Sequence, residues 1–239
     1  VVADLEPARE PIRAAQAEWA ARVREAARDA GEHIEFLLDS GSGRTMLDLA
    51  RIVAASTSGP LVLGASNPVR AFDLAVPALE GRVVHSNRGQ AGIDGTIATA
   101  VGICLGSGYA GEASAPSDER ITAVLGDLTA CHDASSLALA ASVGAHLDIV
   151  VADDGGGGIF ATLEHGRAAS PDAYDRWFGV AQAVDYEALA AAYGVAFARA
   201  DEPQELESLL ARPASGPRLI HAPIERAAHL YAAIREIVN

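Results

Sequence analysis

The chain repeats one order of features: a short apolar run, a glycine-rich polar turn and a helical stretch. Six such runs occupy 61–63, 82–85, 122–125, 148–152, 195–198 and 218–221. Short runs without polar alternation are typical of strands buried on both faces of a parallel sheet. The helical stretches between most of them supply the crossovers that parallel strands require. This order predicts an α/β fold with a doubly wound, mainly parallel six-stranded sheet flanked by helices.

The composition excludes several functions. Half of the 239 residues are apolar, which is enough for a buried core, and the formal net charge is −14. An acidic chain without a basic cluster is poorly suited to bind nucleic acid or an anionic membrane. All 18 basic residues are arginines, so the chain has no Schiff-base lysine and no P-loop lysine. No apolar stretch is long enough for a membrane span and no secretory signal is visible, so we expect a cytoplasmic protein.

The first 40 residues differ in pattern from the rest. Residues 7–31 have the spacing of an amphipathic helix, with Ile12, Trp19 and Val23 on one face. Gly31 and the polar segment 39–43 are expected to end this helix. The pattern therefore divides the chain into a helical segment over 1–40 and one α/β domain over 41–239.

Two aspartates come where neighbouring predicted strands end. Asp127 stands in the sequence Gly-Asp-Leu-Thr after one strand, and Asp154 comes 27 residues later, before the glycines at 155–158. This separation allows one crossover helix, so both carboxylates should lie at the same edge of the sheet. Two carboxylates and a glycine carbonyl suit Mg²⁺ that also binds phosphate, and glycine lets the backbone approach a ligand closely. The alternative interpretation is a pair of ordinary turns without a metal.

Four motifs in this order carry a family resemblance. They are GASNPVR at 64–70, SNRGQAGIDGT at 86–96, GDLTACHD at 126–133, and the segment 149–160 from IVV to GIF. Together they resemble enzymes that use thiamine diphosphate (ThDP). Among these they resemble the MenD family of menaquinone biosynthesis, the synthases of 2-succinyl-5-enolpyruvyl-6-hydroxy-3-cyclohexene-1-carboxylate (SEPHCHC). The resemblance covers nearly the whole chain, as the carboxy-terminal part of such an enzyme.

The resemblance implies a site for ThDP and Mg²⁺, with Mn²⁺ able to replace the magnesium. Asp127, Asp154 and the carbonyl of Gly156 would bind the metal. Ile93 matches the bulky residue that props the cofactor in a bent form, and Thr129 would meet its diphosphate. The residues that would contact the cofactor are Ile93, Gly126, Asp127, Leu128, Thr129, Asp154, Gly156, Gly157 and Ile159.

The resemblance also implies a transketolase-type transferase that decarboxylates 2-oxoglutarate and adds the succinyl semialdehyde unit to isochorismate. Arg70 and Arg88 match arginines that hold substrate carboxylates and are expected to act in catalysis, with Ser66 as a polar neighbour. Phe160 and Leu163 match apolar positions near the isochorismate site. Two alternatives stay open: another ThDP-dependent 2-oxoacid decarboxylase or carboligase, and a non-catalytic module that binds ThDP.

Parts of the family pattern are missing from this chain. Position 153 is Asp where the family usually has Asn, which adds negative charge beside the predicted metal. The family's amino-terminal pyrimidine-binding domain, which carries the glutamate that activates the cofactor, has no counterpart in the sequence. The helix over 1–40 would connect to that preceding domain. We therefore expect the chain alone to be inactive, and the complete enzyme to be a homodimer or homotetramer.

Overall fold

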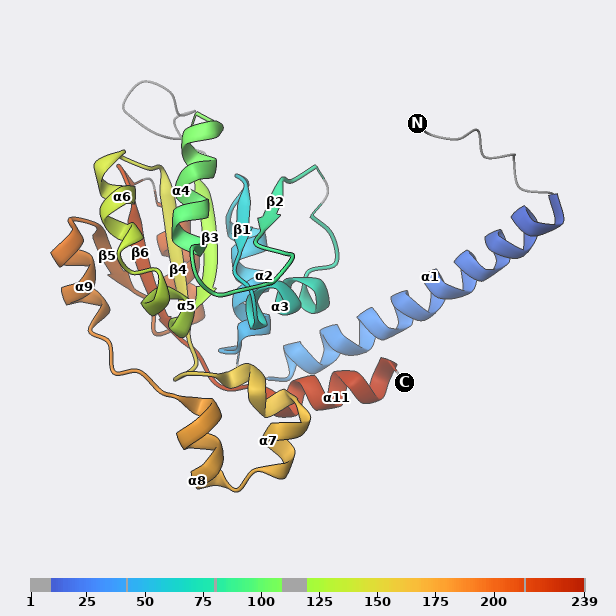
Figure 1. Cartoon of the computed structure of the whole chain (residues 1–239). Helices are drawn as coiled ribbons and strands as arrows, with labels where there is room; N and C mark the ends of the chain where they lie inside the picture. Colours follow the sequence, from blue (N-terminus) through green and yellow to red (C-terminus); the bar gives the residue numbers. More distant parts are fainter. Residues whose placement is uncertain (1–9, 42, 80, 109–119, 213, 239) are drawn as a thin grey trace.

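A single six-stranded sheet forms the centre of the molecule (Figure 1). The computed structural model describes residues 10–41, 43–79, 81–108, 120–212 and 214–238. Every neighbouring pair of strands is parallel, and the strand order is β2-β1-β3-β4-β6-β5. The strands are β1 (Leu61–Leu63), β2 (Val84–Ser86), β3 (Ile121–Gly126), β4 (Leu147–Asp153), β5 (Ala196–Arg199) and β6 (Arg218–Pro223). The predicted parallel sheet is confirmed.

Helices cover both faces of this sheet (Figure 1). The sheet therefore separates the core into two apolar clusters, one on each face. One cluster is built from α2 (Met46–Ser56), α3 (Asn67–Ala75), α10 (Pro203–Leu210) and α11 (Ala228–Val238). The other is built from α4 (Thr96–Gly106), α6 (Ser136–Ser142) and α9 (Tyr186–Tyr193). Val124 belongs to the first cluster and Leu125 to the second, because successive strand residues point to opposite faces. Burial on both faces explains why the sequence of β3 is mostly apolar.

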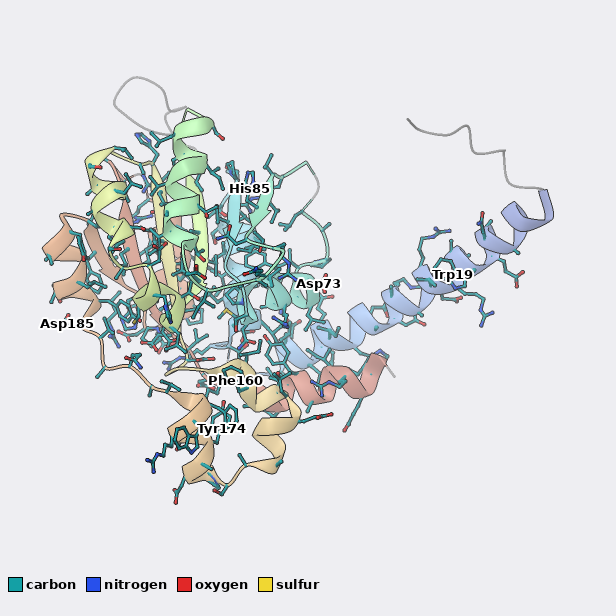
Figure 2. The ribbon with its side chains drawn as sticks, in the orientation of Figure 1. Trp19, Asp73, His85, Phe160, Tyr174 and Asp185 are labelled. Atoms are coloured by element: carbon teal, nitrogen blue, oxygen red, sulfur yellow. The ribbon has the colours of Figure 1, made fainter. Side chains whose placement is uncertain are left out.

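The first helix is longer than the sequence predicts. Helix α1 spans Glu10–Asp39 and passes through Gly31 without ending; the predicted start at 7–9 lies outside the described residues. A glycine in a helix costs only about 1 kcal/mol relative to alanine. Burial of Ile34 and Leu38 in the first core cluster outweighs this cost. Trp19, on the predicted apolar face, is 67% exposed on the part of α1 that extends away from the domain (Figure 2).

None of the helices in the described ranges, α1 included, has the length and apolarity needed to cross a membrane.

The strand order reverses between β1 and β3. The chain leaves β1 through α3 on one face of the sheet, but it leaves β3 through α5 (Asp127–His132) and α6 on the other. At such a switch point the two connections diverge and leave a crevice beyond the carboxyl ends of the strands, where ligands of open α/β sheets bind. We therefore expect a ligand site at the loops after β1, β3 and β4.

A buried group of charged side chains lies at the amino-terminal ends of the central strands, opposite the loops named above. Asp148 in β4 is 1% exposed and accepts hydrogen bonds from two guanidinium groups. Arg218 in β6 donates from Nε to Oδ1 at 2.9 Å and from Nη2 to Oδ2 at 3.0 Å. Arg120, just before β3, donates to the same two oxygens at 3.0 and 3.1 Å. These bonds tie together the starts of three adjacent strands.

Candidate cofactor and metal site

An open pocket of about 130 Å³ lies at the carboxyl ends of β1, β3 and β4. Most residues that the sequence assigned to the site line this pocket: Ser66, Ile93, Gly126, Asp127, Leu128, Thr129, Asp154, Gly156, Gly157, Ile159 and Phe160. Arg70, Arg88 and Leu163 are not among its lining residues. The fold thus brings together the three segments 66–68, 126–129 and 152–160 from different parts of the chain.

Asp127 is the first residue of α5 and is almost completely buried. Its Oδ1 accepts a hydrogen bond from the Leu128 amide at 2.7 Å, whereas Oδ2 is buried and accepts no hydrogen bond from an N–H or O–H group within the described ranges. The Asp127 side chain also meets the carboxyl group of Asp153, and the two hydrogen-bond only when one of them is protonated. Burial is the main cause that raises the pKa of Asp127 to about 7, and the negative charges of Asp154 and Asp153 add to it. An unpaired buried acceptor costs about 1–3 kcal/mol of folding free energy. A bound cation would remove this cost.

Asp154 directly follows β4 and supplies the second carboxylate of the pocket. Burial raises its pKa to about 6, against the opposing effect of the positive charge on Arg226. The Arg226 side chain also holds the backbone of the loop, since its Nε donates to the Asp154 carbonyl at 2.8 Å and its Nη2 to the Gly155 carbonyl. Two carboxyl groups whose pKa values are both raised face one small volume, which is an arrangement that favours a divalent cation.

Three glycines after Asp154, at positions 156–158, leave no room for side chains. Gly156 has a φ of +124°, and a Cβ there would overlap the carbonyl oxygen of Gly179. A Cβ at Gly157 would overlap the Phe178 carbonyl, and one at Gly158 would overlap the Asp154 carboxylate. The backbone at these positions therefore lines the pocket directly, with the Gly156 carbonyl accepting from the Gly158 amide at 3.0 Å. A carbonyl oxygen has a second lone pair, so Gly156 can still bind a cation.

Short helices that carry aromatic side chains pack against the glycine loop. They are η1 (Gly158–Thr162), α7 (Glu164–Ala168), α8 (Pro171–Tyr174) and η2 (Asp175–Gly179). The ring of Phe160 lies 5.7 Å from that of Phe178, and the hydroxyl of Tyr174 donates to the Gly157 carbonyl at 3.0 Å. Figure 2 shows Phe160 and Tyr174 below the sheet, on this group of short helices. Phe160 is 37% exposed and Leu163 is 42% exposed, so both present apolar surface to solvent.

The two arginines lie at the same edge of the sheet but outside the pocket. Arg70 is exposed on α3, and its Nη1 donates to the Ser66 carbonyl at 2.6 Å. Ser66 itself has a φ of +76°, a left-handed conformation that is costly for a residue with a side chain. Arg88 is exposed on the loop after β2. Both arginines follow strands that end at this side of the sheet, and their contact with a substrate stays a prediction.

Replacement of Gly156 by alanine should disturb the pocket and the fold together. The new Cβ would meet the Gly179 carbonyl, and φ is unfavourable for alanine, so we expect a loss of about 1–3 kcal/mol in unfolding free energy. Urea unfolding measures this loss. Gly102→Ala is the matched control, because Gly102 is exposed within α4 and a Cβ there meets nothing within 4 Å. The control should gain about 0.5–1 kcal/mol; equal effects at both glycines would contradict the tight packing at Gly156.

The geometry defines a class of protein: an α/β domain whose switch point carries one buried and one half-buried carboxylate beside a glycine-rich loop. The model of one family, the C-terminal TPP-binding domain of thiamine pyrophosphate enzymes, matches residues 70–222. The match covers more than half of the chain, so the chain belongs to this family. Thiamine pyrophosphate and ThDP are the same cofactor, and the predicted resemblance to ThDP enzymes is confirmed.

Within this family, the chain is similar to curated SEPHCHC synthases. A SEPHCHC synthase of Nocardioides sp. is 40% identical over 215 residues, covering 87% of this chain and 38% of the relative. That of Renibacterium salmoninarum is 41% identical over 203 residues, and that of Mycobacterium tuberculosis is 43% identical over 181 residues. They confirm the resemblance to this group of enzymes. The chain spans less than two fifths of the length of the Nocardioides relative that it matches.

Solved structures show the same fold at much lower identity. A putative thiamin diphosphate-dependent enzyme of Mycobacterium smegmatis has a TM-score of 0.58 at 17% identity, covering 78% of this chain and 32% of its own. The thiamine diphosphate-dependent 4-hydroxybenzoylformate decarboxylase of Rhodococcus jostii RHA1 has a TM-score of 0.62 at 18% identity, covering 79% of this chain and 34% of its own. These neighbours support the fold assignment.

Three residues with structural roles in the site were not found from the sequence. Arg226 holds the backbone after β4, Tyr174 holds the Gly157 carbonyl, and His221 bonds to Asp153. A signal existed for two of them, because His221 and Arg226 come at or just after the end of β6, next to β4 in the sheet. Tyr174 lies on a short helix that could not be predicted, because its sequence has no apolar periodicity.

Proposed function

We propose that this chain is the part of a SEPHCHC synthase that binds the diphosphate of ThDP together with Mg²⁺. Its curated relatives of 40–43% identity carry that name, and its family is a TPP-binding domain. The observation that carries the proposal is the pocket that Asp127 and Asp154 line together, in which the buried Oδ2 of Asp127 accepts no hydrogen bond from an N–H or O–H group of the described residues.

The residues present fit a magnesium ion bound to a diphosphate. The Asp127 and Asp154 carboxylates and the Gly156 carbonyl would supply three oxygens, and phosphate oxygens and water would complete the coordination that Mg²⁺ prefers. The Leu128 amide already donates to Asp127, so it serves the metal ligand instead of the phosphate. Thr129 and the open glycine backbone are left to face the diphosphate, and Ile93 and Ile159 would contact the apolar part of the cofactor.

In such an enzyme, bound ThDP would supply the electron sink for decarboxylation of 2-oxoglutarate and for addition of the succinyl unit to isochorismate. This chain would orient the cofactor and hold the substrates. Each of the two substrates carries two carboxylates, and a guanidinium group binds a carboxylate through paired hydrogen bonds. Arg70 and Arg88 would serve this role at the carboxyl edge of the sheet. We place the complete enzyme in the cytoplasm as a homodimer or homotetramer, with the pyrimidine-binding domain supplied outside this chain.

Removal of either arginine should weaken substrate use and spare cofactor binding. In the complete enzyme, Arg88→Ala and Arg70→Ala should each lower kcat/KM about 10- to 100-fold, the value of one charge-assisted hydrogen bond. The ThDP concentration for half-maximal activity should stay the same. Arg212→Ala is the matched control, since Arg212 is exposed after α10 and lines a cavity at the opposite edge of the sheet. Loss of ThDP affinity with an unchanged substrate KM would reverse the assigned roles.

Complementation tests the proposed reaction. The chain is mixed with, or fused to, the remaining amino-terminal segment of the Nocardioides relative, and turnover is followed with ThDP, Mg²⁺, 2-oxoglutarate and isochorismate. We expect SEPHCHC formation in the complemented protein and none by the chain alone. Turnover of a different 2-oxoacid or acceptor instead would favour another ThDP-dependent decarboxylase or carboligase. Equal turnover by the chain alone would refute the need for a second domain.

A further inference from the structure

His221 makes contacts that position a carboxylate next to the metal loop. It lies near the end of β6, is 8% exposed, and its ring packs on that of Tyr186 with centroids 4.6 Å apart. Its Nε2 lies 2.8 Å from Oδ2 of Asp153, and its Nδ1 lies 3.3 Å from Nη1 of Arg199. An arginine can only donate, so Nδ1 is the acceptor and the ring proton is on Nε2. His221 therefore donates to Asp153.

Asp153 passes this constraint to the loop that follows β4. While Oδ2 accepts from His221, Oδ1 accepts from the amide of Gly155 at 3.0 Å. Gly155 stands between Asp154 and Gly156, and its φ of +76° turns the chain at this point. The peptide that carries this amide joins Asp154 to Gly155 and comes one residue before Gly156, so its orientation restrains the backbone from which both predicted metal ligands project. A continuous series of hydrogen bonds thus runs from Arg199 through His221 and Asp153 to this loop.

A second contact set holds the same loop from the other side. Arg226 donates to the carbonyls of Asp154 and Gly155, so it leaves the Gly155 amide to Asp153. The carbonyl side and the amide side of the turn are therefore fixed by different residues. The Asp154 carbonyl and the Gly155 amide belong to one planar peptide, so loss of the amide contact would leave Arg226 alone to hold that peptide.

We propose that His221 is a positioning residue for the metal and diphosphate site: it orients Asp153, which holds the Gly155 amide and thereby aligns Asp154 and Gly156. This inference rests on the proposed function, because it assigns the purpose of the alignment to that site. Groups that orient metal ligands without touching the metal are commonly worth 10- to 100-fold in metal affinity.

The test measures Mn²⁺ affinity of the purified chain with inorganic pyrophosphate, using the electron paramagnetic resonance signal of free Mn²⁺. His221→Ala should weaken Mn²⁺ binding about 10-fold or more. His221→Gln keeps an N–H donor and should recover most of the loss. His146→Ala is the matched control, because His146 precedes β4 at the opposite edge of the sheet and should change nothing. If His221→Ala does not fold, Asp153→Ala should show the same loss.

A second readout needs no metal. Hydrogen exchange of the Gly155 amide in the metal-free chain should become faster in His221→Ala and in Asp153→Ala, and should be unchanged in His146→Ala. Unchanged Mn²⁺ affinity and unchanged Gly155 exchange in both of the first two variants would overturn the inference. A wild-type chain that binds no Mn²⁺, but whose Gly155 exchange depends on His221, would overturn the proposed function while leaving the hydrogen-bond series intact.

Discussion

Asp127→Asn is expected to abolish Mg²⁺-dependent binding of ThDP while making the metal-free chain more stable. The amide keeps the size of the carboxylate and can still accept from the Leu128 amide, but it carries no charge to bind a cation. We expect ThDP affinity in Mg²⁺ to fall at least about 100-fold, since a direct ligand is worth more than the groups that orient it. Calorimetric titration measures this change.

The stability effect has the opposite sign, and its dependence on pH can be worked out. The pKa of Asp127 is about 7 in the folded chain, compared with about 4 for an aspartate in an unfolded chain. Above pH 7 the carboxyl group is ionised in both states, so the folded state carries the full cost of a buried charge. Below pH 4 it is protonated in both states and that cost disappears. The gain in Asp127→Asn should therefore be about 1–3 kcal/mol near pH 8 and small near pH 4.

Urea unfolding of the metal-free chain at both pH values checks this prediction. Asp73→Asn is the matched control, because Asp73 is exposed on α3 (Figure 2). The control should change neither stability nor ThDP affinity by more than a few tenths of a kcal/mol, as is usual at exposed sites. An Asp127→Asn chain that is less stable at pH 8 yet binds ThDP normally would contradict both the unpaired Oδ2 and the metal assignment.

Asp148→Ala is expected to cause the largest loss of stability in the molecule. The side chain of Asp148 is 2% exposed, and it is bonded to Arg120 and Arg218, whose side chains are 9% and 8% exposed. Its removal leaves two buried guanidinium groups without their carboxylate. Breaking a buried ion pair in this way costs about 3–5 kcal/mol. The unfolding free energy from urea titration should fall by that amount.

The exposed pair between Arg199 and Asp201 provides the comparison for Asp148. Their side chains are 51% and 52% exposed, and Asp201→Ala should cost no more than about 1 kcal/mol. If Asp148→Ala costs as little as Asp201→Ala, the buried charges do not hold the starts of β3, β4 and β6 together. A loss near 3 kcal/mol or more, with unchanged Mn²⁺ binding in the folded fraction, would separate this stabilising role from the site at the other edge.

The sheet could be predicted from the sequence because burial on both faces produces a direct signal. Runs such as 122–125 and 148–152 contain mostly apolar residues, and the strands Ile121–Gly126 and Leu147–Asp153 extend each of them by one residue at either end. Helix ends were harder to predict. Gly31 was expected to end a helix that continues to Asp39. Tertiary packing of Ile34 and Leu38 decided this case.

The pocket could be predicted in part because strand ends of a parallel sheet meet at one edge. That rule brings Asp127 and Asp154 together from their positions in the sequence alone. It said nothing about side chains that reach the loop from β6 and beyond, so His221 and Arg226 were missed. The same rule did not explain how the negative charge of Asp153 is accommodated beside the predicted metal. The added charge at that position is matched by the hydrogen bond from His221, which is the first cause of the lowered pKa of Asp153.

The central claim is that this chain binds the diphosphate of ThDP through a divalent metal held by Asp127 and Asp154. The most direct measurement is a calorimetric titration of ThDP into the purified chain with Mg²⁺, with Mn²⁺, and with EDTA. Binding is predicted with either metal and not with EDTA, and thiamine without its diphosphate should neither bind nor compete. Equal ThDP affinity with Mg²⁺ and with EDTA, or competition by thiamine, would contradict the claim.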